Sequence, residues 1–225
     1  MLPDEMYKKW CDWLHEIHKE VQLLVTDEYV FQHLEKIVFA NPAVVKNGYL
    51  FNWIANHYHA SQIVTIRRLI DKDSRSISFI RLFDSIIGNP TVLSRARFVS
   101  LYKDQVRSKE IANEHFDQFY GSGLDHTDVG KVTADRDELL RVSKPVAVHS
   151  TKNFAHLDED RAQHLATYDD MDRTIKLMHD LVRRYHLMLE SNHYPSLVPN
   201  WTHDWRNVLK IPWIMPADSH SPELH

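Results

Sequence analysis

Residues 152–158 hold a lysine, a histidine and an aspartate whose spacing could support acid–base chemistry. His156 stands between apolar neighbours, with Lys152 four residues before it and Asp158 two residues after it. An imidazole exchanges protons near neutral pH, and a nearby ammonium group can hold a phosphate. His149 could be a second acid or base, which chemistry at phosphorus can use. We therefore predict phosphodiester chemistry at this segment.

A structural role is the alternative interpretation of the same residues. The imidazole of His156 could simply bond a neighbouring carbonyl group. Asp158 could orient an imidazole, or it could cap the following helical segment. The residues alone leave both interpretations open.

A second charged pair lies on the helix predicted for residues 44–71. At 100° per residue Arg67 falls on the apolar side of that helix, and Asp71, one turn further on, can pair with it. Because burying an unpaired arginine is costly, Arg67 has either a partner or a wet pocket around it. It is therefore a structural ion pair or an anion-binding residue in a cleft.

Histidine is the compositional outlier, with 16 copies, so a metal site is a further interpretation. His15 and His18 have a same-face helical spacing, and Glu190 is followed three residues later by His193. No His-Glu-x-x-His zinc motif is present. Our primary prediction therefore contains no metal and no cofactor.

Composition limits the class of protein. The 225 residues carry a formal charge of −4, which excludes a global basic field for nucleic acid. The single cysteine, Cys11, excludes an internal disulfide and fits a reducing cytoplasm. We expect neither a signal peptide nor a membrane-spanning segment, because no apolar run is long enough.

Five glycines and helical apolar spacings predict an all-α protein. We expect a bundle of five to seven helices in one domain, 1–225, with a core at about 44–191 and an irregular tail, 192–225, packed on it by tryptophans. The expected helices span residues 2–39 with a break near Thr26, then 44–71, 76–87, 91–120, one from Thr133 that Pro145 kinks or interrupts, and one capped by Thr167 with Asp170.

Four segments in this order resemble the HEPN superfamily, and within it the abortive-infection AbiU-like branch: residues 66–71, 76–79, 152–158 and 205–213. The resemblance implies a helical bundle, often a homodimer, in which many members are metal-independent ribonucleases. In those members an arginine four to six residues before a histidine grips the scissile phosphate, and the histidine helps the ribose 2′-hydroxyl attack. Such toxins are often paired with a nucleotidyltransferase-type antitoxin in phage defence.

The histidine of that motif maps onto His156, but the arginine does not map. Lys152 stands in the window and could supply the charge, although as a point charge and not as a bidentate fork. Arg67 or Arg141 could reach the site from elsewhere in the fold. The resemblance thus implies a ribonuclease that uses Lys152, His149 and His156, supported by Arg67, Asp71 and Asp158. A catalytically silent scaffold that binds a protein partner is the alternative, and a histidine-metal bundle is the second alternative.

Overall fold

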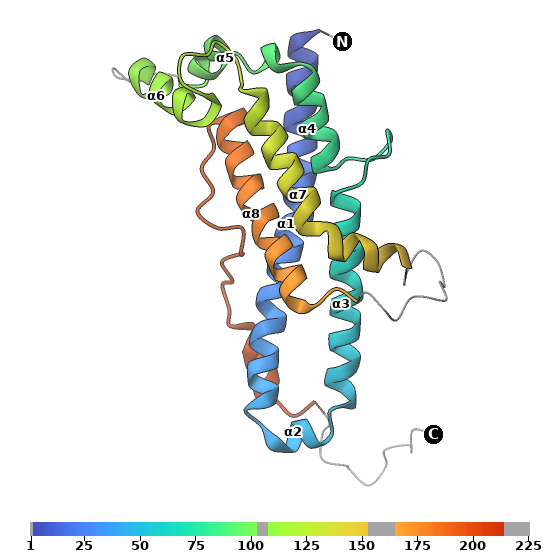
Figure 1. Cartoon of the computed structure of the whole chain (residues 1–225). Helices are drawn as coiled ribbons and strands as arrows, with labels where there is room; N and C mark the ends of the chain where they lie inside the picture. The colour runs from blue at the N-terminus through green and yellow to red at the C-terminus, as the bar shows by residue number, and fades with distance from the viewer. Residues whose placement is uncertain (1, 103–107, 153–164, 214–225) are drawn as a thin grey trace.

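Four long helices that alternate in direction form the body of the protein (Figure 1). The structure, a computed structural model, describes residues 2–102, 108–152 and 165–213. The long helices are α1 (Pro3–Phe39), α3 (Tyr49–Leu69), α7 (Val129–Ser150) and α8 (Tyr168–Glu190). The shorter elements are α2 (Pro42–Lys46), α4 (Phe79–Gly88), η1 (Pro90–Val92), α5 (Arg95–Ser100), α6 (Ser108–Tyr120) and η4 (Trp205–Lys210). The predicted all-helical bundle is confirmed, and two of the eight described α-helices, α2 and α5, have six residues or fewer.

The apolar stripe of α1 explains its length. Trp10, Leu14, Ile17 and Val21 recur at helical spacing and are buried. The break predicted near Thr26 is wrong, because the Thr26 hydroxyl donates to the Gln22 carbonyl at 2.6 Å and is satisfied inside a continuous helix.

Two other predicted helices are divided in the structure. The helix predicted at 44–71 is split at Asn47 and Gly48, between α2 and α3. The long helix predicted at 91–120 is also wrong. Ser94 accepts the backbone N–H of Arg97 and starts the short helix α5. The described residues 94 and 126 form an isolated β-bridge, and the described chain has no longer strand pairing.

Helix α3 carries Arg67, and helix α7 carries His149 and leads into Lys152. Asp128, not Thr133, caps α7 by accepting the N–H of Gly130 at 2.7 Å. Pro145 lies inside α7 without ending it, and Figure 1 shows the helix bending toward its C-terminal end. The capping box of Thr167 and Asp170 at the start of α8 is present as predicted.

The main hydrophobic cluster joins all four long helices and extends through α1 to Trp10, before the range expected for the core. The tail packs along α1 chiefly through Leu197, which is buried, whereas Trp213 is 65% exposed. Trp201 contacts the ring of Tyr29 with centroids 5.0 Å apart. Within the described part of the chain, no helix has the length and apolar character that crossing a bilayer requires.

Candidate functional site

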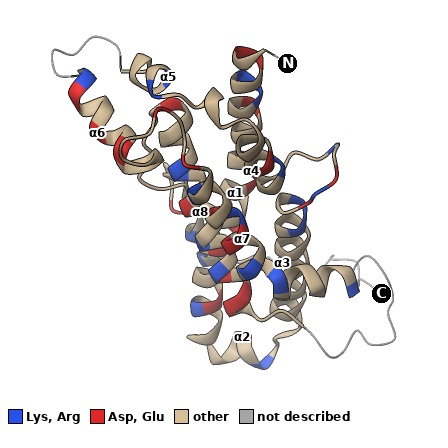
Figure 2. Ribbon diagram, turned by 45° about the horizontal axis from the view of Figure 1, so that its top comes forward, with Lys and Arg blue, Asp and Glu red and all other residues tan. Residues whose placement is uncertain are grey.

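Three of the predicted residues meet in a cleft between the C-terminal parts of α3 and α7. Arg67, Asp71 and Lys152 all line this cleft, whose volume is about 450 Å³. Sequence reasoning missed two further cations in the lining, Lys72 and Lys144. We call this site the α3–α7 cleft. Figure 2 shows Lys and Arg positions on both helices where they lie side by side.

The lining of the α3–α7 cleft is amphipathic. Its apolar wall consists of Ile70, Leu140, Ala147 and Val148. Its charged part consists of one carboxylate, Asp71, and four cations, Arg67, Lys72, Lys144 and Lys152. The cleft is therefore locally positive, although the chain as a whole has a formal charge of −4. A signal for the missed Lys144 existed in the sequence. Lys144 and Lys152 are eight residues apart, which would place them about 80° apart around a continuous helix and so on the same side of it.

Arg67 combines both roles that the sequence left open. Its Nη1 atom is 3.5 Å from Asp71 Oδ1, and both side chains are more than a third exposed. Asp71 Oδ1 also accepts the backbone N–H groups of Lys72 at 2.8 Å and Asp73 at 3.3 Å. The carboxylate therefore helps to end α3, while the guanidinium group is only weakly held and faces the cleft.

His149 is buried and engaged with the backbone. Its Nδ1 atom accepts the N–H of Ala166 at 3.0 Å, so the imidazole is neutral with its proton on Nε2. The ring of His59 lies 5.2 Å away, and His59 Nε2 faces the carbonyl oxygen of Ala166 at 3.3 Å. Burial and the neighbouring His59 lower the pKa of His149. These contacts tie α3 and α7 to the residue before the cap of α8.

The remaining predicted residues, His156 and Asp158, lie outside the described residues. Lys152 is the last described residue before them. Their roles stay predictions.

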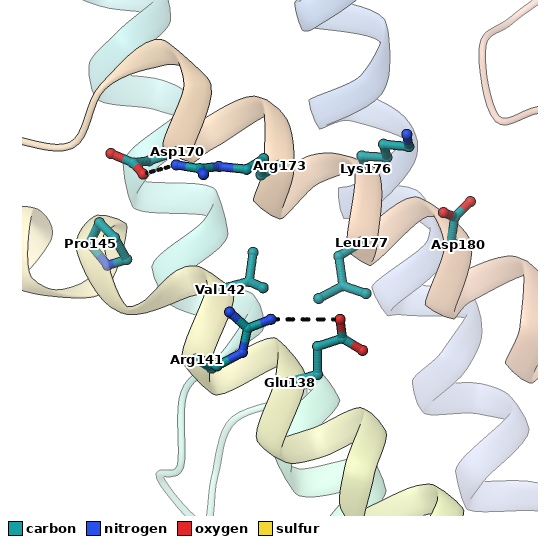
Figure 3. A pocket seen from close by; sticks show the side chains of 9 residues that line it. All are labelled: Glu138, Arg141, Val142, Pro145, Asp170, Arg173, Lys176, Leu177 and Asp180. Atoms are coloured by element: carbon teal, nitrogen blue, oxygen red, sulfur yellow. Dashed lines mark hydrogen bonds and ion pairs between the residues drawn. The ribbon is translucent and has the colours of Figure 1, made fainter.

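A second pocket, of about 500 Å³, lies between α7 and α8 (Figure 3). Arg141, which was expected to be able to reach the predicted site, lines this α7–α8 pocket instead. Its guanidinium group is 3.8 Å from Glu138, and Arg173 pairs with Asp170 at 2.6 Å. Because both arginines have carboxylate partners, this pocket is electrostatically more balanced than the α3–α7 cleft.

An arginine and a histidine beside the α7–α8 pocket have a spacing that was not recognised in the sequence. Arg173 lies six residues before His179, which is within the interval that the HEPN resemblance implies for its arginine and histidine. His179 Nδ1 is 3.2 Å from Asp180 Oδ1, and Asp180 lines the pocket with Arg173.

A third group joins α1 to α8. His15 Nε2 is 3.1 Å from Glu190 Oε1, and His186 Nδ1 is 2.8 Å from Glu190 Oε2. His18 Nδ1 faces His186 Nε2 at 2.9 Å. Sequence reasoning found the pair of His15 and His18 but matched Glu190 with His193. We call these four residues the α1–α8 histidine cluster.

The described residues form the helical bundle that the HEPN resemblance implies. The family model described as AbiU2 matches residues 7–208, and the chain therefore belongs to the HEPN_AbiU2 family. The resemblance stated from the sequence is thus confirmed. No curated protein and no solved structure matches the chain.

Proposed function

We propose that the chain is an RNA-acting HEPN protein that cleaves RNA without a metal ion, with His156 as the acid–base residue. The observation that carries this proposal is the α3–α7 cleft. It gathers four cations against one carboxylate on a chain of net negative charge. Such a local concentration of positive charge favours a phosphate backbone where the molecule as a whole does not.

The chemistry would divide between the cleft and the histidine. Lys152 and Arg67 hold the phosphate, and the weak pairing of Arg67 with Asp71 lets a phosphate oxygen compete for the guanidinium group. His156 accepts the proton of the ribose 2′-hydroxyl as its oxygen attacks phosphorus. The bond to the 5′-oxygen breaks, leaving a cyclic phosphate and, after protonation, a 5′-hydroxyl. His149 supports this arrangement through α7, since its Nδ1 atom is occupied by the backbone.

Cleavage of a mixed RNA pool in EDTA tests the proposal. Wild type should cleave and leave cyclic-phosphate ends, His156→Ala should lose cleavage, and Lys152→Ala should weaken it. His179→Ala is the matched control, because it removes the histidine that follows an arginine, Arg173, at the spacing that the HEPN resemblance implies. Loss with His179→Ala but not with His156→Ala would move the site to the α7–α8 pocket. Absence of cleavage by the wild type would contradict the ribonuclease proposal.

A partner-binding role is the second candidate, because one end of the bundle exposes large apolar side chains. Phe39, Tyr49, Leu50 and Trp53 are each more than half exposed, around a groove of about 460 Å³ lined by α1, α2, α3 and the tail. We call this surface the apolar end. Exposed apolar patches of this kind mark interaction surfaces. Because the HEPN resemblance implies a homodimer, we propose that a second copy of the chain covers the apolar end.

Light scattering on the wild type and on Trp53→Asp tests the dimer. We expect a dimer that Trp53→Asp converts to a monomer, with Trp201→Asp, on the tail beside Tyr29, as a control that stays dimeric. A monomeric wild type would contradict the homodimer.

The proposed setting is a toxin in the cytoplasm, paired with a nucleotidyltransferase-type antitoxin in phage defence.

A further inference from the structure

The α1–α8 histidine cluster has donor atoms of the kinds that bind transition metals. His15 and His18 are three residues apart on α1, and His186 and Glu190 are four apart on α8. These spacings place each pair on one face of its helix. One ligand atom from each of His15, His186 and Glu190 lies within 4.8 Å of the others.

We propose that His15, His186 and Glu190 form a binding site for Zn²⁺, with His18 as the positioning residue for His186. Two imidazoles and a carboxylate are a ligand set that zinc uses, and the fourth position would be open to water. Neighbouring donors around tetrahedral zinc are about 3.3 Å apart for bonds of about 2.0–2.1 Å. The present separations are 3.1 Å from His15 Nε2 to Glu190 Oε1 and 2.8 Å from His186 Nδ1 to Glu190 Oε2, so each nitrogen lies a few tenths of an ångström nearer to its own carboxylate oxygen than that value.

The surroundings distinguish this cluster from a surface group of charges. His186 is fully buried and the Glu190 side chain is only 15% exposed, so two of the three ligands have restricted conformations. The His15 side chain is 50% exposed and leaves a route from solvent to the ion. A site with fixed ligands on one side and an accessible ligand on the other can admit an ion without opening the bundle.

His18 completes the arrangement behind His186. Its Nδ1 atom is 2.9 Å from His186 Nε2, on the opposite side of the ring from Glu190. Histidine ligands commonly bond their second ring nitrogen to another group, which fixes the orientation of the ring. The ring of Tyr194 packs edge-on against His18 with centroids 4.9 Å apart and holds it in place.

This inference does not depend on the proposed ribonuclease activity. His186 lies 18 residues beyond the start of α8 at Tyr168, which corresponds to roughly 27 Å along the helix. The start of α8 is the end bonded to His149 through Ala166. Zinc in the cluster would join α1 to α8, far along the bundle from the α3–α7 cleft.

Calorimetric titration of the full chain with ZnCl₂, after treatment with EDTA and its removal, tests the site. We expect one equivalent to bind tightly and the weaker binding of other surface histidines to follow. His15→Ala and Glu190→Gln should each lower the affinity at least about 100-fold, and His18→Ala about 10- to 100-fold. His57→Ala is the matched control, because His57 is an exposed histidine on α3 that bonds the Trp53 carbonyl one turn away. It should leave the affinity unchanged.

Co²⁺ in place of Zn²⁺ gives a second readout. Tetrahedral coordination should give intense visible absorption in the wild type and in His57→Ala, and this absorption should disappear in His15→Ala. Because His15 is half exposed, its substitution should leave the fold intact, which circular dichroism in EDTA checks. Equal affinity in wild type, His15→Ala and Glu190→Gln would overturn the proposal, as would a wild type that binds no tight equivalent.

Discussion

The α3–α7 cleft and the α1–α8 histidine cluster both gather titratable side chains between two long helices, but they satisfy them differently. In the cleft, Arg67 and its partner Asp71 are more than a third exposed and 3.5 Å apart. In the cluster, His186 is fully buried and bonded at 2.8 and 2.9 Å to Glu190 and His18. The cleft therefore presents charge to a ligand from solvent, whereas the cluster completes its own hydrogen bonds.

In the metal-free protein, this difference separates residues that are available to a ligand from residues that stabilise the fold. A cation that faces water contributes little to folding, because solvent screens its interactions. A buried imidazole that bonds two polar neighbours cannot be removed without leaving those neighbours unpaired. Substitutions in the cluster should therefore lower the free energy of unfolding, and substitutions in the cleft should change ligand affinity at nearly constant stability.

The largest effect is expected from His186→Ala. The substitution opens a cavity and leaves Glu190 and His18 without their shared partner, so the free energy of unfolding should fall by about 2–4 kcal/mol. Urea denaturation in EDTA measures it without a contribution from zinc. His15→Ala, which removes a half-exposed partner of the same carboxylate, should cost less than about 1 kcal/mol. Equal costs for the two variants would erase the contrast between buried and exposed members of the cluster.

The sequence predicted the elements better than the sites. Periodicity in α8, with Ile175, Met178 and Val182 buried as expected, is a local property and can be read directly. The predicted helix boundaries were wrong where a side-chain cap starts a new helix, as Ser94 does before α5. The full histidine cluster was not predicted for a different reason. Its partners are about 170 residues apart, and only the packing of α1 on α8 brings His18 to His186.

The second effect concerns the cleft. Replacing Lys144 and Lys152 together with alanine should weaken single-stranded RNA binding about 10-fold and reduce the salt dependence by about 0.7 for each phosphate that is no longer neutralised. The free energy of unfolding should change by less than about 0.5 kcal/mol. Fluorescence anisotropy at several salt concentrations, in a His156→Ala background that prevents cleavage, measures the affinity and its salt dependence. Lys176→Ala, in the α7–α8 pocket, is the control, and an equal loss from it would assign RNA to that pocket.

The third effect is a pH dependence to which two histidines contribute: His149, which follows the cleft residue Val148 on α7, and His18 of the cluster. Burial, followed by the adjacent His59, lowers the pKa of His149, and burial, followed by His186, lowers that of His18, from a usual value of 6.5. The unfolded chain therefore binds more protons as the pH falls below 6.5. The stability that these two histidines contribute is complete above that pH and is lost as the pH falls toward their lowered pKa values, by at most about 1.4 kcal/mol per pH unit for each proton.

His149→Asn tests which region dominates that dependence. The asparagine carbonyl oxygen can still accept the Ala166 N–H but cannot be protonated, so the slope of unfolding free energy against pH below 6.5 should decrease. A remaining slope would belong to His18 and the other histidines. His57→Asn, on the exposed face of α3, should leave the profile unchanged. An unchanged slope in His149→Asn would mean that the cluster alone carries the effect.

The smallest effect separates the two partners of one ion pair. Arg67→Ala should change the free energy of unfolding by less than about 0.5 kcal/mol, because its pairing with Asp71 is long and exposed. Asp71→Ala should cost about 1 kcal/mol, since that carboxylate also accepts the N–H groups of Lys72 and Asp73 where α3 ends. Paired urea denaturation curves measure the difference. Equal losses of unfolding free energy in the two variants would indicate that the Arg67–Asp71 ion pair has only a structural role. A larger cost for Asp71→Ala, with RNA affinity lost only in Arg67→Ala, would mean that the carboxylate builds the helix end and the guanidinium group is held for an anion.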